Sequence, residues 1–140
     1  MYTVSTVQEQ VYEERKRIST PKDVQVLMTE HFDPHKERFY VLLLNTKNEL
    51  LKVDLVSVGS LNASIAHPRE ILKSAILESA ASIILVHNHP TGDPTPSNED
   101  VEFSRRMAKC CELMGIALLD HVIVGNGTGC FASLKEKGVF

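Results

Sequence analysis

Blocks of apolar residues alternate with polar stretches along the chain, and the length and period of each block predict a secondary-structure element. Residues 39–44 are an apolar run, and residues 50–58 resume a strand-like pattern after the polar turn 45–48, so the two predict a β-hairpin. Residues 83–86 are consecutive apolar residues, mostly β-branched, which is typical of a strand buried on both faces. Residues 116–124 predict another buried strand.

Apolar residues recur at helical spacing in three further segments. Residues 21–32 follow Thr20, a capping residue, and end before Pro34, which opposes continuation of a helix. Pro68 opens a second helix, in which the apolar positions are Ile71, Leu72, Ala75, Ile76 and Ala80. A third helix is expected over residues 97–114, where the polar and apolar positions again follow a helical period.

Glycine and proline residues mark the connections between these elements. Gly115 is expected to stop the third helix, and Gly59 with Asn62 indicates a bend after the hairpin. Residues 87–96 hold three prolines and a glycine, so we expect a loop there. The turn at residues 125–127 closes the last strand.

The predicted order of elements is helix, hairpin, helix, strand, helix, strand. This order predicts the α/β class: a single compact domain in which a mixed β-sheet is flanked by helices. A chain of 140 residues is long enough for one domain with one core and too short for two. We therefore predict a polar N-terminal segment over residues 1–19 and one domain over residues 20–140.

Charge, cysteine content and hydropathy exclude several classes of function. The net charge is -3 with both signs scattered, which argues against a domain that mainly grips the phosphates of a nucleic acid. The 3 cysteines form neither a disulfide framework nor a cysteine-based zinc site. No apolar run approaches the length of a membrane span, and the N-terminus lacks a basic start followed by an apolar block. We expect a cytoplasmic protein with no membrane partner.

The stretch that carries chemistry begins where a buried strand ends. Residues two apart on a strand point the same way, so His87 and His89 can present both imidazoles to one point. Ser97 and Asp100 are three apart and share one face of the first turn of a helix. Two imidazoles and one carboxylate are three ligands for zinc, and a catalytic zinc leaves its fourth position to water. The spacing therefore predicts one zinc ion per chain.

The pattern His-x-His, seven residues, then Ser-x-x-Asp resembles the signature of JAMM (JAB/MPN-type) metallopeptidases. The flanking residues 68–71, 87–90 and 119–121 are similar to the RadC branch of this class, and the resemblance covers roughly residues 20–140. It implies a JAB/MPN fold with a layout like that of cytidine deaminases. RadC-type proteins usually carry a helix-hairpin-helix region in front, so this chain resembles their short form or the catalytic domain.

The resemblance also implies a role for each site residue. His87, His89 and Asp100 would bind zinc, and Ser97 would hydrogen-bond the developing oxyanion or position the water. Glu37, at the start of the strand after the first helix, would be the general base. The rival bases are Glu70, Glu99 and Glu102.

Each assignment has a simpler alternative. Ser97 can be an ordinary helix N-cap, Asp100 can merely favour the positive end of the helix, and Glu37 can be a solvated side chain. Asp120 and His121 lie within an apolar strand and need partners. We favour structural hydrogen bonds for them over a contact to a zinc-binding histidine.

Three functions compete. The leading hypothesis is a zinc metallopeptidase that hydrolyses peptide or isopeptide bonds in a peptide or protein substrate. The second is action on nucleic acid linked to DNA repair, but the residues of HNH nucleases are dispersed, and zinc deaminases use a His-x-Glu and Pro-Cys-x-x-Cys pattern that this chain lacks. The third is a non-catalytic MPN-type interaction module.

Overall fold

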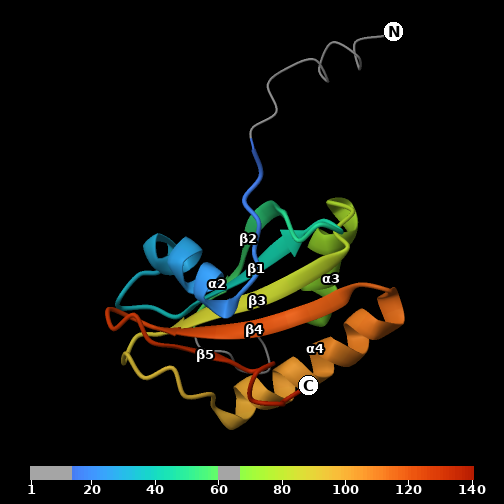
Figure 1. Ribbon diagram of the computed structural model, residues 1–140. Coiled ribbons are helices and arrows are strands. Elements are labelled where there is room, and N and C mark those ends of the chain that lie inside the picture. The colour runs from blue at the N-terminus through green and yellow to red at the C-terminus, as the bar shows by residue number, and fades with distance from the viewer. Residues whose placement is uncertain (1–13, 60–66) are drawn as a thin grey trace, which may run out of the picture.

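A five-stranded β-sheet forms the centre of the protein, and helices cover both of its faces (Figure 1). The computed structural model describes residues 14–59 and 67–140. The elements, in chain order, are α2 (Pro21–Met28), the 3-10 helix η1 (Thr29–His31), β1 (Arg38–Leu44), β2 (Leu50–Val58), α3 (Pro68–Leu77), β3 (Ser82–His89), α4 (Asn98–Met114), β4 (Ala117–Gly125) and β5 (Phe131–Ser133). The bend predicted at Asn62 lies outside the described residues.

The sheet is mixed, and its strand order is β2-β1-β3-β4-β5. β1 runs antiparallel to both β2 and β3, while β3 and β4 run parallel and are connected by α4. A parallel pair needs a crossover connection, which α4 supplies. This arrangement confirms the predicted α/β class. β5, which pairs with β4, was not predicted, because its three residues are too few to show a strand period.

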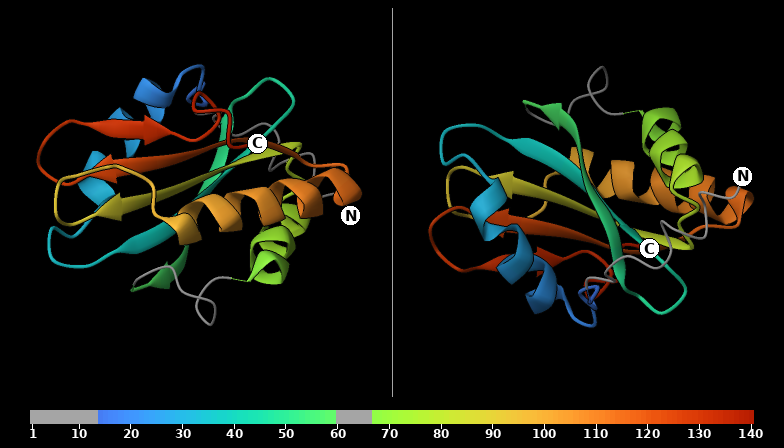
Figure 2. Two further views of the ribbon diagram at one scale, coloured as in Figure 1. Left: turned by 90° about the horizontal axis from the view of Figure 1, so that it is seen from below. Right: turned by 90° about the horizontal axis from the view of Figure 1, so that it is seen from above.

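Alternation along β3 divides the core between the two faces of the sheet. Ile84 and Val86 pack on the face covered by α2, and Ile83 and Leu85 pack on the face covered by α3 and α4. Figure 2 shows these two layers from opposite sides. Because successive side chains of a strand point to opposite faces, His87 and His89 belong to the α3–α4 face, as do Ile83 and Leu85.

β3 is longer than the sequence indicates. We expected a loop from His87 onward, but that prediction was wrong, because the strand runs to His89. β3 lies between two partners, and its pairing continues from Phe39 opposite His87 to Gly125 opposite His89. Pairing with both neighbours at His87, and with β4 alone at Asn88 and His89, thus holds polar residues in a regular strand, and both imidazoles are carried on the sheet itself.

The predicted helix signals are confirmed at the starts of α2, α3 and α4 and at the end of α4. Thr20 and Asp23 form a reciprocal capping box at the start of α2, and Ser97 and Asp100 form another at the start of α4. Gly115 ends α4 in the left-handed conformation, with φ of 70°. The helix predicted over residues 21–32 is divided between α2 and η1.

The end of the predicted polar segment pairs with the hairpin. Leu50 N–H donates to the carbonyl of Lys16 over 2.7 Å, and Ile18 N–H donates to the carbonyl of Asn48 over 2.9 Å. The Ile18 side chain is only 4% exposed and belongs to the core on the α2 face. The domain boundary after residue 19 stays a prediction.

Membrane crossing has no support from the described part of the chain, where every helix is too short or too polar to span a bilayer.

Candidate metal centre

The structure brings His87, His89 and Asp100 together at one point. His87 Nε2 lies 3.2 Å from His89 Nε2 and 3.1 Å from Asp100 Oδ1, and His89 Nε2 lies 3.3 Å from Asp100 Oδ2. The two histidines come from the end of β3 and the carboxylate from the first turn of α4. Among the described residues, these three form the one group of its kind that can hold a metal ion.

The spacing of these atoms fits a small tetrahedral ion. Nitrogen and oxygen ligands lie about 2.0–2.2 Å from zinc, so two ligands of a tetrahedral site stand about 3.3–3.5 Å apart. The two Nε2 atoms, 3.2 Å apart, are close to that edge length, and each lies 3.1–3.3 Å from a different oxygen of the Asp100 carboxylate. Imidazole nitrogens and a carboxylate oxygen are also the donor types that zinc accepts. The residues present therefore fit the metal that the resemblance implies.

Asp100 is fixed by its own helix. Its Oδ2 accepts a hydrogen bond from Ser97 N–H at 2.8 Å, and its own N–H donates to Ser97 Oγ at 3.1 Å. The carboxylate is 1% exposed. Burial by itself raises the pKa of Asp100, but hydrogen bonds from His87 and His89 outweigh burial and hold that pKa well below its usual value. The site therefore favours a negative carboxylate beside a cation.

His87 is enclosed by ring contacts on the α3–α4 face. Its ring stacks on Phe39 with centroids 5.7 Å apart, and the side chain is 2% exposed. Its Nδ1 lies 2.8 Å from Nε2 of His121, and His121 Nδ1 is hydrogen-bonded to Ser104 Oγ. We had favoured a structural hydrogen bond for His121. Instead, the structure shows direct contact with one of the candidate ligands.

This contact assigns the tautomers of both rings. If His87 Nε2 is the ligand atom, Nδ1 carries the hydrogen and donates to His121 Nε2. His121 then carries its hydrogen on Nδ1 and donates to Ser104 Oγ. Burial lowers the pKa of His121 far below its usual value, and the neighbouring His87 lowers it further, so His121 stays neutral and can accept.

His89 is oriented by the loop that follows β3. Its Nδ1 donates to the carbonyl of Asp93 at 2.8 Å, so in the neutral ring Nε2 carries the lone pair that a metal ion would take. The hydrogen bond to Asp100 raises the pKa of His89 against the effect of burial, and the charge of Glu37 adds a smaller contribution. Like the lowered pKa of Asp100, this shift shows that the site attracts positive charge.

Glu37 lies directly before β1 and is half-buried. Glu37 is two residues before Phe39, so strand alternation places it on the α3–α4 face, where Phe39 lies opposite His87; it is not part of the three-residue group. The rival bases Glu70, Glu99 and Glu102 all lie on helix surfaces and are exposed. The structure thus brings one predicted base to the site, and its catalytic role stays a prediction.

Ser97 is exposed, and its oxygen accepts the helix-capping hydrogen bond from Asp100 N–H. The structure confirms this capping role, which was the simpler alternative. The hydroxyl hydrogen is not used by that bond, because a serine hydroxyl accepts and donates at once. A second role for Ser97 toward a substrate is therefore compatible with the cap and stays a prediction.

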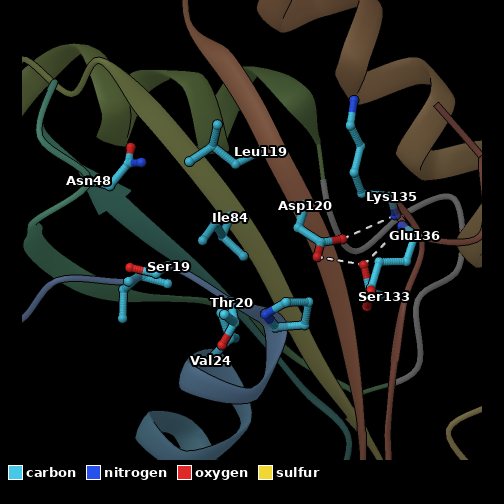
Figure 3. Close-up of a pocket in the computed structure, with 12 residues that line it drawn as sticks. Ser19, Thr20, Val24, Asn48, Ile84, Leu119, Asp120, Ser133, Lys135 and Glu136 are labelled. Carbon is cyan, nitrogen blue, oxygen red and sulfur yellow. Dashed lines mark hydrogen bonds between the residues drawn. The ribbon is translucent and has the colours of Figure 1, made fainter.

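Asp120 belongs to the other face of the sheet. Its Oδ2 accepts from Ser133 Oγ at 2.7 Å and its Oδ1 accepts from Lys135 N–H at 3.2 Å, as Figure 3 shows. It borders a cavity of about 300 Å³ between the start of α2 and the sheet. The structure thus confirms the structural hydrogen bonds that we favoured for Asp120. Its neighbour His121 lies on the other face and contacts His87.

Sequence reasoning missed Asn88 and Ser104, which are both fully buried near the centre. The available signal was a polar residue inside a buried segment, because a buried polar group needs partners. The sequence does not reveal which partners those are, since Asn88 contacts residues 50–55 positions earlier.

Known proteins with similar sequences share most of this chain. A family model described as the RadC-like JAB domain matches residues 18–139. A UPF0758 protein of Methanosarcina mazei is 51% identical over 129 residues, which cover 91% of this chain and 56% of that protein. A UPF0758 protein of Clostridium kluyveri is 55% identical over 124 residues, which cover 88% of this chain and 54% of that protein.

A third relative, a UPF0758 protein of Halalkalibacterium halodurans, is 53% identical over 136 residues, which are 96% of this chain and 56% of that protein. The chain therefore spans about half the length of the curated relatives it matches. Their shared name states no activity. With nearly the whole chain matched by one family model, and with the His-His-Asp group in place, the chain belongs to the RadC-like JAB domain family.

Proposed function

We propose that this domain is a zinc-dependent hydrolase of peptide or isopeptide bonds. The observation that carries the proposal is the His87–His89–Asp100 group, in which the two Nε2 atoms are 3.2 Å apart and each lies within 3.3 Å of the Asp100 carboxylate. The JAB superfamily includes metalloisopeptidases, which supports the choice of amide bonds. The cytoplasmic location and a peptide or protein substrate stay predictions.

The three ligands would hold the ion at the end of β3, next to the exposed start of α4. When bound, a zinc ion supplies Lewis-acid chemistry: it polarises a carbonyl oxygen and makes water acidic enough to attack near neutral pH. Water has little access to two of the three residues, because His87 is stacked on Phe39 and Asp100 is buried in the first turn of α4. The side near Ser97 is open to a substrate.

Glu37 would move the proton. A carboxylate close to the attacking water takes its proton and later gives it to the leaving amine. Ser97 would act on the other partner of the reaction, because its free hydroxyl hydrogen can donate to the oxyanion that develops from the scissile carbonyl. Neither group is a metal ligand, so each can be replaced without removing the metal.

The experiment that tests this function measures metal and turnover together. Elemental analysis of purified wild type, His89→Ala and Asp100→Ala is expected to give about one zinc per chain in wild type and none in the variants. A screen of peptide and isopeptide substrates should then find turnover that is lost in Glu37→Gln while zinc is retained. Zinc at one per chain with no turnover on any amide would favour the interaction-module alternative, and failure of wild type to take up zinc would end the proposal.

A further inference from the structure

Asn88 lies between the two candidate histidine ligands in the sequence, but its side chain is not part of the candidate metal group and bonds the loop before β1. Strand alternation turns it to the face opposite His87 and His89. It is fully buried, with 0% exposure. A buried primary amide is stable only when its donors and acceptor are satisfied, so its partners show what it holds.

The amide of Asn88 bonds the main chain on both sides of Glu37. Its Oδ1 accepts from Arg38 N–H at 2.7 Å, and its Nδ2 donates to the carbonyl of Lys36 at 2.9 Å. A main-chain N–H only donates and a carbonyl only accepts, so the orientation of the amide is determined by these two partners. The backbone position of Glu37 is therefore fixed by the hydrogen bonds that Asn88 makes to Lys36 and Arg38.

The hydrogen bonds of Asn88 replace the main-chain pairing between β1 and β3, which does not extend to Arg38. The pairing of β1 with β3 ends at Phe39 opposite His87, so no further ladder bond holds the chain before Phe39 on that side. On the side of β2, Gly59 N–H donates to the carbonyl of Glu37 at 2.8 Å. The main chain at Glu37 is thus held directly by Gly59 N–H. It is held indirectly by Asn88, which bonds the residues on either side of Glu37.

Two further contacts tie Asn88 to neighbouring loops. Nδ2 also lies 3.3 Å from the carbonyl of Asp33, and it is hydrogen-bonded to Oδ1 of Asn126 after β4. The loop that leads into Glu37 is therefore fastened to the strand that carries the two histidines. A one-residue shift or a rotation in this loop would carry the Glu37 carboxylate away from His89.

We propose that Asn88 is a positioning residue, which sets the carboxylate of Glu37 against the metal centre by holding the backbone at Lys36 and Arg38. This inference rests on the proposed function, because it assigns to Glu37 the proton transfer described above. It separates Glu37 from the rival glutamates, since the exposed Glu70, Glu99 and Glu102 have no such attachment to β3.

A positioning role and a merely structural role predict different kinetics. If Asn88 acts through Glu37, Asn88→Ala lowers kcat by on the order of 10²-fold while KM and the zinc content stay close to wild type. In a Glu37→Gln background the same change adds almost nothing, because the group that it positions is already gone. A structural role predicts equal losses in both backgrounds, and that result would overturn the inference.

Asn45→Ala is the matched control. Asn45 also bonds main-chain groups of a turn, with its Oδ1 accepting from Lys47 N–H and Glu49 N–H, but this turn joins β1 to β2 at the other end of β1. It should lower stability without a comparable change in kcat. If Asn88→Ala does not fold, Asn88→Ser replaces it, because serine keeps one donor and one acceptor in less volume.

Hydrogen exchange gives a measurement that does not depend on catalysis. The Arg38 amide is expected to be protected in wild type and to exchange faster in the Asn88 variant, while the Leu43 amide inside β1 stays protected in both. This result would support the role of Asn88 in holding the backbone at Lys36 and Arg38, even if no amide substrate is turned over and the proposed function fails. Unchanged protection of Arg38 in a folded Asn88 variant would overturn the inference even if the hydrolase is active.

Discussion

Nδ1 of His87 and Nε2 of His121 lie 2.8 Å apart, although the two residues belong to neighbouring parallel strands and are 34 positions apart. Both rings are buried, so no water replaces this contact. One nitrogen of His87 faces the ligand group and the other faces His121. If His87 binds a metal, the nitrogen that it offers is therefore set by His121, which is outside the candidate metal group.

His121→Gln is expected to weaken zinc binding by about 10–100-fold, because the hydrogen bond that fixes the His87 ring is lost or misplaced. Competition with a chromophoric zinc chelator measures the affinity. His35→Gln is the control, since His35 is exposed and should leave the affinity unchanged. An affinity equal to wild type in a folded His121→Gln protein would show that the contact does not act on the metal centre.

Ser97→Ala is expected to have two separable effects. Loss of the cap lowers the free energy of unfolding by about 1 kcal/mol, and loss of the hydroxyl donor lowers kcat by roughly 10²–10³-fold. Thr20→Ala removes the equivalent cap from α2 and should lower stability alone. Ser97→Asp keeps a capping oxygen but no donor, so it should recover stability and not turnover. Full activity in Ser97→Ala would remove the oxyanion role.

Gly125→Ala tests the close contact between the loops beside the centre. A Cβ at Gly125 would lie 2.1 Å from the carbonyl oxygen of Gly92, so the loop that carries Asp93 and orients His89 must move. We expect a loss of about 1–3 kcal/mol in stability, together with weaker zinc binding.

The matched control is Gly115→Ala, at the end of α4. Nothing lies within 4 Å of a Cβ there, so the loss comes only from the positive φ of 70° and is about 1–2 kcal/mol. Zinc affinity should not change. Chemical denaturation and the chelator assay measure both quantities, and equal zinc affinity in the two variants would contradict the prediction.

The raised pKa of Asp120 leads us to expect that its contribution to stability decreases as pH rises, which is the opposite of the usual behaviour of a carboxylate. Burial raises the pKa of its carboxyl above 3.8, against the hydrogen bonds from Ser133, Lys135 N–H and His121 N–H. The folded state then keeps this proton to higher pH than the unfolded chain, so this contribution to stability falls as pH rises from 3.8 through the raised pKa. Asp120→Asn should abolish that part of the pH dependence, which urea unfolding at several pH values measures.

Asp23 is the comparison with the opposite sign. Hydrogen bonds from the N–H groups of Ser19 and Thr20 lower its pKa, so its contribution is present above 3.8 and is lost as pH falls through the lowered pKa. The wild type minus Asp23→Asn difference in unfolding free energy should therefore rise with pH. A difference that runs the same way for both variants would contradict the assignment.

The parts of the fold that were predictable depend on neighbours in sequence. The hairpin follows from two apolar runs around a polar turn, and the start of α4 follows from Ser97 with Asp100 three residues later. The pairing of His87 with His89 on one face was predictable from the strand period, and their grouping with Asp100 was predictable from the resemblance to the JAMM signature. These signals lie within a few residues of each other.

The parts that were missed depend on contacts across the sheet. His121 touches His87 only because β4 is the parallel neighbour of β3, and Asn88 reaches Lys36 and Arg38 only because β1 ends beside it. The extension of β3 to His89 has the same origin, since pairing with β4 continues to His89 and outweighs the local signal of a loop. The sequence pattern of one strand does not indicate which other strands will lie beside it in the sheet.

The capping box at the start of α4 has a consequence for how the protein handles metal. Asp100 is oriented by Ser97 N–H and by its place in the helix, so its side chain loses rotational freedom when the chain folds and not when an ion arrives. Folding then does not depend on the ion that the candidate centre would bind. The domain should keep its fold when a chelator strips the metal, and it can be reloaded without passing through an unfolded state, unlike small domains in which the metal is the core.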